Sequence, residues 1–190
     1  MKKIFALLTL LLPLCLNAQW LGKHHVEIGA GAAIPGEVLV KTDAAPEAST
    51  FSVYGEYLYE LTPDLSVGGV YSYVFPHIVT HPLEEGELHT KDDYHTLDVL
   101  AEYKLLNSKA ICVFAGAGGG PQLRRVVIDD DISWSWTEDV FFSADLYAYV
   151  GIEFRKHIRL TVGHHHDLHY PISGLPSGAP YSHISLGWAF

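Results

Sequence analysis

The sequence predicts an all-β protein, an eight-stranded antiparallel up-and-down β-barrel, on the strength of three observations. Apolar and polar residues alternate with a period of two through eight segments, as in strands that have one apolar and one polar face. Short and long connections between these segments alternate strictly. The last segment ends at Phe190 on an apolar ladder of Ile184, Leu186 and Trp188. Closing eight such strands into a barrel removes the exposed sheet edges.

Four segments in the first half of the chain have the strand pattern. The segment HVEIGAGAAI, residues 25–34, alternates apolar residues with polar or small ones. In FSVYGEYLYEL, residues 51–61, the odd positions are apolar or glycine, and the even ones include a serine and two glutamates. LSVGGVYSYVF, residues 65–75, repeats this pattern, and HTLDVLAEYKL, residues 95–105, sets five apolar residues against Asp, Glu and Lys. Each segment is therefore predicted to be a strand.

The second half supplies four more strands. AICVFAGAGG, residues 110–119, has little contrast between its faces because of its small residues. VFFSADLYAYVGIEF, residues 140–154, has a continuous apolar row opposite Ser, Asp and Glu. HIRLTVG, residues 157–163, and SHISLGWAF, residues 182–190, complete the set. Because successive strand residues point to opposite sides, each of these segments also has two distinct faces.

The connections predict a barrel with two unlike ends. Three of them are tight turns, and four are long and rich in Pro, Gly, Asp and His. The turns are residues 62–64, 107–109 and 155–157, and the long connections are residues 35–49, 76–93, 120–137 and 164–180. One end of the sheet is thus expected to carry turns and the other to carry loops.

The polar face is charged, which leaves two orientations open. A soluble lipocalin-like carrier of an apolar ligand would turn these charges to water, whereas a membrane barrel would enclose them in a polar lumen. The opposite face is rich in Tyr and Phe near the strand ends, as interfacial girdles require, and the loop asymmetry matches transmembrane barrels. We therefore predict a transmembrane barrel with the apolar face outward. The residues predicted on the polar face are Glu27, Glu56, Glu60, Asp98, Glu102, Lys104, Asp145, Glu153 and Arg159.

The first 18 residues have the order of a secretory signal peptide: two lysines, an apolar run, then small and polar residues ending at Ala18. The predicted domains are a signal peptide at 1–18 and a barrel at 19–190. Pro13 and Leu14 do not suit a lipidation signal at Cys15. Loss of the two lysines leaves 10 bases against 22 acids, which argues against nucleic acid as a partner. Cys112 is then the only cysteine, so no intrachain disulfide is expected.

The terminal strand resembles the C-terminal signal of bacterial outer-membrane barrels, which combines a final aromatic residue with apolar residues at alternate positions. With the leader and the loop pattern, residues 19–190 resemble the small eight-stranded OmpA/OmpX-like outer-membrane barrels. The resemblance implies residence in the outer membrane, contact with its lipid and lipopolysaccharide, and recognition by the barrel assembly machinery. It also implies a packed lumen without a pore and a structural or interaction role exercised by the external loops.

Twelve histidines suggest a metal-binding function. Imidazole suits zinc, copper or nickel, and a divalent metal is the one cofactor that the sequence suggests. Because neighbours on a strand point to opposite faces, His164, His165 and His166 cannot all bind one ion while extended. Four more histidines, at 77, 81, 89 and 95, were expected in or beside the second long loop. The predicted metal ligands, at the start of the last long loop, are His164, His165, His166, Asp167 and His169.

An enzyme is the alternative function. Some barrels of this kind are lipid A deacylases, and that family carries a His-x-Ser-Asn stretch where this chain has GHHHDLHY. No serine follows His165 or His166 at that spacing; the first is Ser173. A serine nucleophile also needs a base oriented by a carboxylate, so no catalytic or cofactor-binding residue is predicted. For the lumen charges, a structural network and a proton or cation path both stay open. The segment RRVVIDDD, residues 124–131, is expected at a loop tip, where its two arginines either contact lipopolysaccharide phosphates or are solvated.

Overall fold

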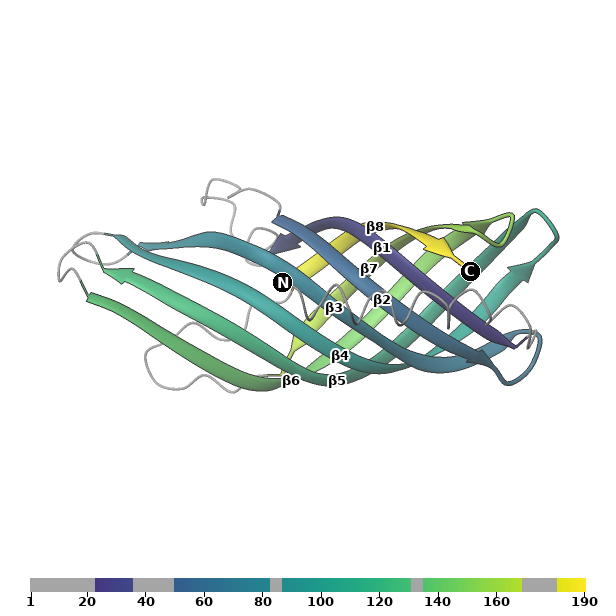
Figure 1. Cartoon of the computed structure of the whole chain (residues 1–190), viewed down its shortest axis with the longest axis horizontal. Helices are drawn as coiled ribbons and strands as arrows, with labels where there is room; N and C mark the ends of the chain where they lie inside the picture. The colour runs from purple at the N-terminus through teal and green to yellow at the C-terminus, as the bar shows by residue number, and fades with distance from the viewer. Residues whose placement is uncertain (1–22, 36–49, 83–86, 131–134, 169–180) are drawn as a thin grey trace, which may run out of the picture.

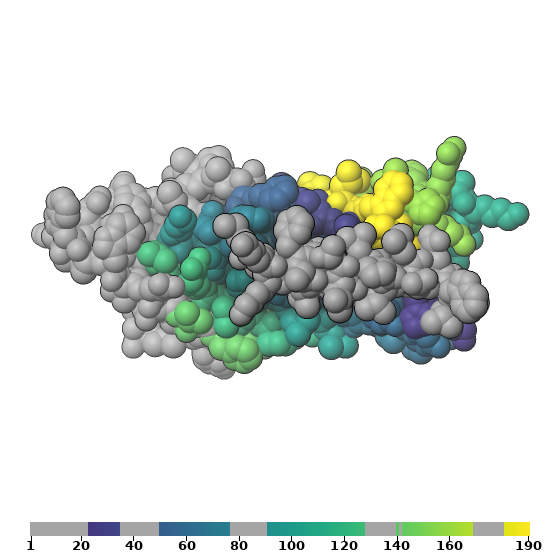
Figure 2. All heavy atoms as spheres, viewed as in Figure 1, coloured from purple at the N-terminus to yellow at the C-terminus, as the bar shows by residue number. Residues whose placement is uncertain are grey.

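Eight antiparallel strands close into a barrel in the order of the chain (Figure 1). The structure is a computed structural model and describes residues 23–35, 50–82, 87–130, 135–168 and 181–190. In Figure 2, β8 (yellow) lies against β1 (purple), where the two strands pair and close the barrel. The strands are β1 His24–Pro35, β2 Thr50–Glu60, β3 Leu65–Pro82, β4 Glu87–Asn107, β5 Ile111–Asp130, β6 Ser135–Phe154, β7 Ile158–Asp167 and β8 Tyr181–Ala189.

The predicted number and order of the strands are confirmed, but the five strands β3 to β7 are longer than predicted. The connection expected at 76–93 is mostly strand, because β3 and β4 continue through it on both sides of residues 83–86. The same correction applies to 120–137, which β5 and β6 largely occupy. The predicted loop at 164–180 also begins later, since β7 extends to Asp167.

Prolines explain why the sequence suggested early strand ends. Pro76 has no backbone N–H to donate, and the β3–β4 pairing shifts register between Val74 and His77, which lets the ladder pass it. Pro121 is opposite Ala144 of β6, while the pairing of β5 with β4 skips from Gln122 to Gly119. Both strands therefore continue past a residue that usually ends one.

Tight turns join the strands at one end, as predicted, and we call this the turn end. The turn between β6 and β7 places Arg155 and Lys156 in the left-handed region, with φ of 50° and 63°. Two consecutive positive φ values are the signature of a type I′ hairpin, which normally selects Asn-Gly or Gly-Gly. The N–H of His157 donates to the carbonyl of Phe154 at 3.1 Å and closes this turn.

The two faces of the sheet have the predicted orientation. Large apolar side chains cover the outside, with exposed fractions as high as 73% for Val99 and 72% for Phe142. Charged side chains are enclosed, including Glu27 and Arg159 at 1% exposure. The nine charged residues predicted on the polar face are all either buried or exposed to a cavity at the turn end. The interior is therefore not an apolar calyx, which removes the soluble-carrier alternative.

The described residues contain no helix long and apolar enough to cross a membrane.

At the end opposite the turns, β3 to β6 project beyond the other four strands (Figure 1). The pairing of β2 with β3 extends only to Val74, and that of β7 with β6 begins at Asp145. Past these residues the described chain continues as a four-stranded sheet up to the β3–β4 and β5–β6 hairpins. We call this part the projecting sheet. It is the largest asymmetric feature of the fold.

Candidate functional site

The lumen near the turn end is organised around one guanidinium group. Arg159, on β7, contacts Glu56 of β2 at 2.8 Å and Glu27 of β1 at 2.9 Å, both through Nη1, and Nη2 donates to Glu102 of β4. Its guanidinium carbon lies 3.9 Å from the centre of the Phe114 ring, close enough for a cation–π interaction. Its Nε also lies 3.8 Å from Glu153 of β6, so one cation links five strands across the lumen. We call Arg159 with Glu27, Glu56 and Glu102 the arginine cluster.

Tyrosines extend the arginine cluster and fill the space beside it. The Tyr149 hydroxyl donates to Glu102 at 3.1 Å, and the Tyr54 hydroxyl donates to Glu27. Gly116 makes room for one of these rings, because a Cβ at that position would overlap Tyr149. The sequence places these groups inside simply because they share one parity along amphipathic strands.

A second group of polar side chains lies further from the turn end. His165 of β7 is stacked between two tyrosine rings, Tyr147 at 4.1 Å and Tyr181 at 4.3 Å between centroids. Its Nδ1 hydrogen-bonds Asp145 of β6 and lies 3.9 Å from Oδ2 of Asp98 on β4. We call Asp98, Asp145 and His165 the aspartate–histidine cluster. All three side chains are at least 98% buried.

Little free space separates the two clusters. The cavity bounded by Arg159 and His165 measures about 20 Å³, enough for about one water molecule. A larger cavity of about 320 Å³ opens at the turn end. The lumen is therefore packed with side chains between the clusters, as expected for eight strands. Of the two interpretations of the lumen charges, this packing favours a structural network over a hydrated path.

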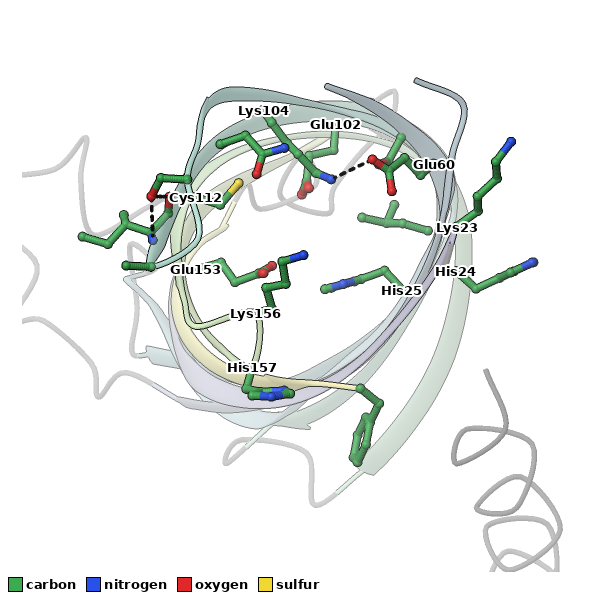
Figure 3. A pocket seen from close by; sticks show the side chains of 17 residues that line it. Lys23, His24, His25, Glu60, Glu102, Lys104, Cys112, Glu153, Lys156 and His157 are labelled. Carbon is green, nitrogen blue, oxygen red and sulfur yellow. Dashed lines mark hydrogen bonds and ion pairs between the residues drawn. The ribbon is translucent and has the colours of Figure 1, made fainter. Parts of the chain in front are cut away.

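The turn-end cavity has a mixed-charge lining (Figure 3). Glu102 of β4 and Glu153 of β6 point into the opening from two strands that flank β5, and Lys104 forms an ion pair with Glu60 at 3.4 Å. Cys112 also borders this cavity and is a free, buried thiol. The acids and bases lie close enough to offset one another, so the opening carries no strong charge of a single sign.

The predicted histidine set does not converge on one point. His164 and His166 face outward, whereas His165 and Asp167 are buried on the lumen side. These four residues belong to β7 rather than to a loop, and alternation along an extended strand separates them. His169 lies outside the described residues. Metal binding by this set stays a prediction.

The other predicted loop histidines are also in strands. Residues 77 and 81 belong to β3, and residue 89 to β4. The His95 ring stacks on Tyr73 with centroids 4.6 Å apart and bonds to the Tyr71 hydroxyl at 2.8 Å. Aromatic packing on the barrel wall therefore accounts for His95.

The RRVVIDDD segment is not a loop tip at its start. Arg124 points into the lumen, where its Nε donates to Asp92 at 3.1 Å, and Arg125 points outward, where its Nε donates to Asp93 at 3.0 Å. Residues 124–130 belong to β5. The paired arginines on adjacent positions thus serve opposite faces of the barrel wall.

The lipid-facing surface contains a Ser–His contact but no catalytic triad among its described contacts. His164 Nδ1 lies 3.0 Å from the Ser182 hydroxyl across the β7–β8 pair. The ring of His164 also lies near that of His166, with centroids 6.4 Å apart. Neither of these two contacts brings a carboxylate that could orient the imidazole as a base.

Sequence reasoning missed the aspartate–histidine cluster. It placed Asp98 and Asp145 in the lumen but assigned His165 to an external loop. Had the predicted strand been extended past Gly163, the alternation of its side chains would have placed His165 on the lumen side. The height at which the three residues meet depends on the stagger between strands, which period-two patterning does not encode.

Neither a protein-family model nor a curated protein sequence matches the chain. Solved structures do. The crystal structure of Neisserial surface protein A is 16% identical with a TM-score of 0.57 and covers 87% of this chain and 95% of its own. The N-terminal β-barrel domain of OprF from Pseudomonas aeruginosa is 16% identical, with a TM-score of 0.51 and coverage of 87% and 97%.

A third solved structure is Ail, the attachment invasion locus protein of Yersinia pestis, in complex with the heparin analogue sucrose octasulfate. It is 11% identical with a TM-score of 0.52 and covers 88% of this chain and 98% of its own. At these identities the likeness establishes the fold. The chain has the fold of the small eight-stranded outer-membrane β-barrels, with its apolar face toward lipid and its charges enclosed.

Proposed function

We propose that this outer-membrane barrel does not conduct ions and that it acts through its projecting sheet, which faces the outside of the cell. The observation that carries the proposal is the combination of a lumen blocked by the arginine cluster and a sheet extended at the opposite end from the turns. Because the lumen is packed with side chains, any interaction with other molecules takes place on the outer surfaces of the barrel. A structural or interaction role at the outer face follows.

The charge at the tips of the projecting sheet limits the kind of partner. Residues 77–90 and 128–139 contain eight acids and no lysine or arginine. A polyanion would be repelled by such tips, and a cationic partner would be attracted at low salt. Sucrose octasulfate, bound by Ail, is therefore not carried over to this chain. We propose a cationic peptide or protein segment as the external partner.

The lipid contacts are proposed to follow the outward belt. Acyl chains cover the apolar residues, and lipopolysaccharide phosphates meet the outward Lys91 and Arg125, both exposed. The alternating face of β8, with Phe190, is proposed to be read by the barrel assembly machinery through strand pairing. Cleavage of the signal peptide after Ala18 is part of the same proposal. The intact mass of the protein extracted from the membrane should correspond to a chain that begins at Gln19. The charge balance gives no reason to expect nucleic acid.

Bilayer recordings test the blocked lumen. The full mature chain, refolded in detergent and inserted into a planar bilayer, is expected to give no stable current steps under conditions in which a general porin does. Regular steps that scale with the amount of folded protein would contradict a non-conducting barrel.

Probe binding tests the external partner. Poly-lysine is expected to bind the protein in proteoliposomes at low salt and to dissociate as salt rises. Neutralising the acids of 128–139 to Asn and Gln should weaken this binding, while the same changes at Asp64 and Glu60, near the turn end, should not. Sucrose octasulfate serves as the anionic probe. Preferential binding of that probe, or equal poly-lysine affinity in both variants, would reject the proposal.

A further inference from the structure

The aspartate–histidine cluster has oxygen atoms without partners. Both carboxylate oxygens of Asp98 and Oδ1 of Asp145 are buried, and among the described residues they contact no hydrogen-bond donor other than each other's carboxyl group. Asp98 is fully buried and Asp145 is 1% exposed. Unpaired carboxylates in a low-dielectric interior are costly, so such groups normally bind a cation or take up a proton. These oxygens therefore point to a ligand.

The arginines near the cluster already have other acids. Arg159 contacts the three glutamates of the arginine cluster, and Arg124 contacts Asp92. Among the residues that the structure describes, the basic side chain bonded to the two aspartates is the imidazole of His165, through Asp145. A single neutral or charged imidazole cannot satisfy two carboxylates with four oxygens. The charge deficit is local to this part of the lumen.

The geometry suits a metal ion. One ligand atom from each of Asp98, Asp145 and His165 lies within 4.8 Å of the others. Tetrahedral ligands about 2.1 Å from zinc lie roughly 3.4 Å apart, so small rotations of the carboxylates bring the donors into place. The imidazole plane is fixed by its two stacking tyrosines, at interplanar angles of 9° and 13°. The nitrogen donor is thus oriented before any ion arrives.

We propose that Asp98, Asp145 and His165 bind one divalent transition-metal ion inside the barrel, and that zinc is a suitable ion. One imidazole and two carboxylates form a mixed donor set that favours zinc over calcium or magnesium, which prefer oxygen alone. Binding releases the Nδ1 proton of His165 where that nitrogen carries one, and three protein ligands leave a fourth position for water. The ion neutralises the two aspartates and links β4, β6 and β7.

This lumen site differs from the outward histidines. His164 and His166 share no face with Asp98, so a metal bound by them would sit on the other side of the wall. The metal site can also be tested separately from the proposed external role, because its test measures metal content and barrel stability. Loss of poly-lysine binding would leave it intact, and loss of zinc would leave the projecting sheet unchanged.

Zinc analysis of the full mature chain, without an affinity tag and refolded in detergent, tests the proposal. After incubation with zinc and removal of the excess, about one zinc per chain is expected, with a raised unfolding temperature in unboiled electrophoresis. Asp98→Asn should weaken zinc binding at least about 100-fold, as loss of a direct ligand exceeds the 10- to 100-fold effect of outer-shell changes. The matched control Glu60→Gln, an acid already paired with Lys104, should retain zinc. A double variant, His164→Ala with His166→Ala, should also retain it.

Three results would overturn the lumen site: no retained zinc in the wild type, equal retention in Asp98→Asn, or loss in the double histidine variant. The first of these would mean that a shared proton neutralises the aspartates. Cobalt substitution keeps the test open if Asp98→Asn does not fold. Wild-type protein loaded with Co²⁺ should give an intense visible absorption of a tetrahedral nitrogen–oxygen site, abolished by excess zinc. A weak octahedral spectrum would reject the site without any variant.

Discussion

Replacing Arg159 with methionine should destabilise the folded barrel by about 5–7 kcal/mol at neutral pH. Removing one partner of a buried ion pair costs roughly 3–5 kcal/mol, since the other charge stays buried and unpaired. Arg159 is 1% exposed and forms ion pairs with four carboxylates, which puts this substitution at the upper end of the range. Loss of the cation over Phe114 adds about 0.5–2 kcal/mol. Methionine keeps most of the apolar stem, so the effect of lost volume is small.

Urea unfolding in detergent, followed by tryptophan fluorescence and by unboiled electrophoresis, measures this effect. Lys109→Met, an exposed turn residue, is the matched control and should change stability by no more than about 0.5 kcal/mol. A variant as stable as wild type at neutral pH would refute the assignment of Arg159 as the central cation.

Three further predictions concern the wall, a turn and assembly. Val162 faces lipid near the middle of β7, and Val162→Arg should lower the folding free energy in bilayer vesicles by about 2–4 kcal/mol. Leu168→Arg, at the end of β7, should lower it by about 0–1 kcal/mol. Equal costs would mean that the lipid-facing belt has been placed wrongly. Lys156→Gly should stabilise the barrel by up to about 1 kcal/mol in urea unfolding, because glycine adopts the φ of 63° without strain, and a loss would contradict the type I′ geometry. Phe190→Ser should lower the amount of heat-modifiable protein in the outer membrane of cells but leave refolding in detergent unchanged. Phe190→Tyr should assemble normally. Equal assembly of the two variants would mean that Phe190 is not part of the assembly signal.

Local patterning was enough to predict the eight strands and the side of each charged residue. Glu27, Asp98 and Arg159 are inside because parity is a property of neighbouring residues on one strand. Strand length was harder to predict, since Pro76 and Pro121 resemble strand ends and only cross-strand pairing reveals that the ladder continues. Pairing is a long-range property that a single sequence does not contain.

The sequence also did not predict which residues from different strands lie close together in the lumen. Asp98 and Asp145 were predicted to face the lumen, yet their closeness to His165 depends on the stagger of β4, β6 and β7 around the barrel. The arginine cluster has the same origin, because its four members come from four strands. Faces follow from the sequence pattern, and heights within the lumen follow from the closed barrel.

The two clusters differ in how their acids are neutralised, and this leads to opposite outcomes for the same type of substitution. Glu102 contacts Arg159, which keeps Glu27 and Glu56 when Glu102 is replaced. Glu102→Gln therefore removes one buried ion pair without leaving an unpaired charge and should lower stability by about 1–3 kcal/mol. The hydrogen-bond partner described for Asp98 is another acid, Asp145, so Asp98→Asn in the presence of chelator removes an uncompensated charge and should raise stability. With zinc present the sign for Asp98→Asn should reverse, because the wild type then gains the metal. Urea midpoints with chelator and with zinc measure both signs. If Asp98→Asn destabilises the chelated protein as much as Glu102→Gln does, Asp98 has a partner inside the barrel and the lumen needs no cation at that height.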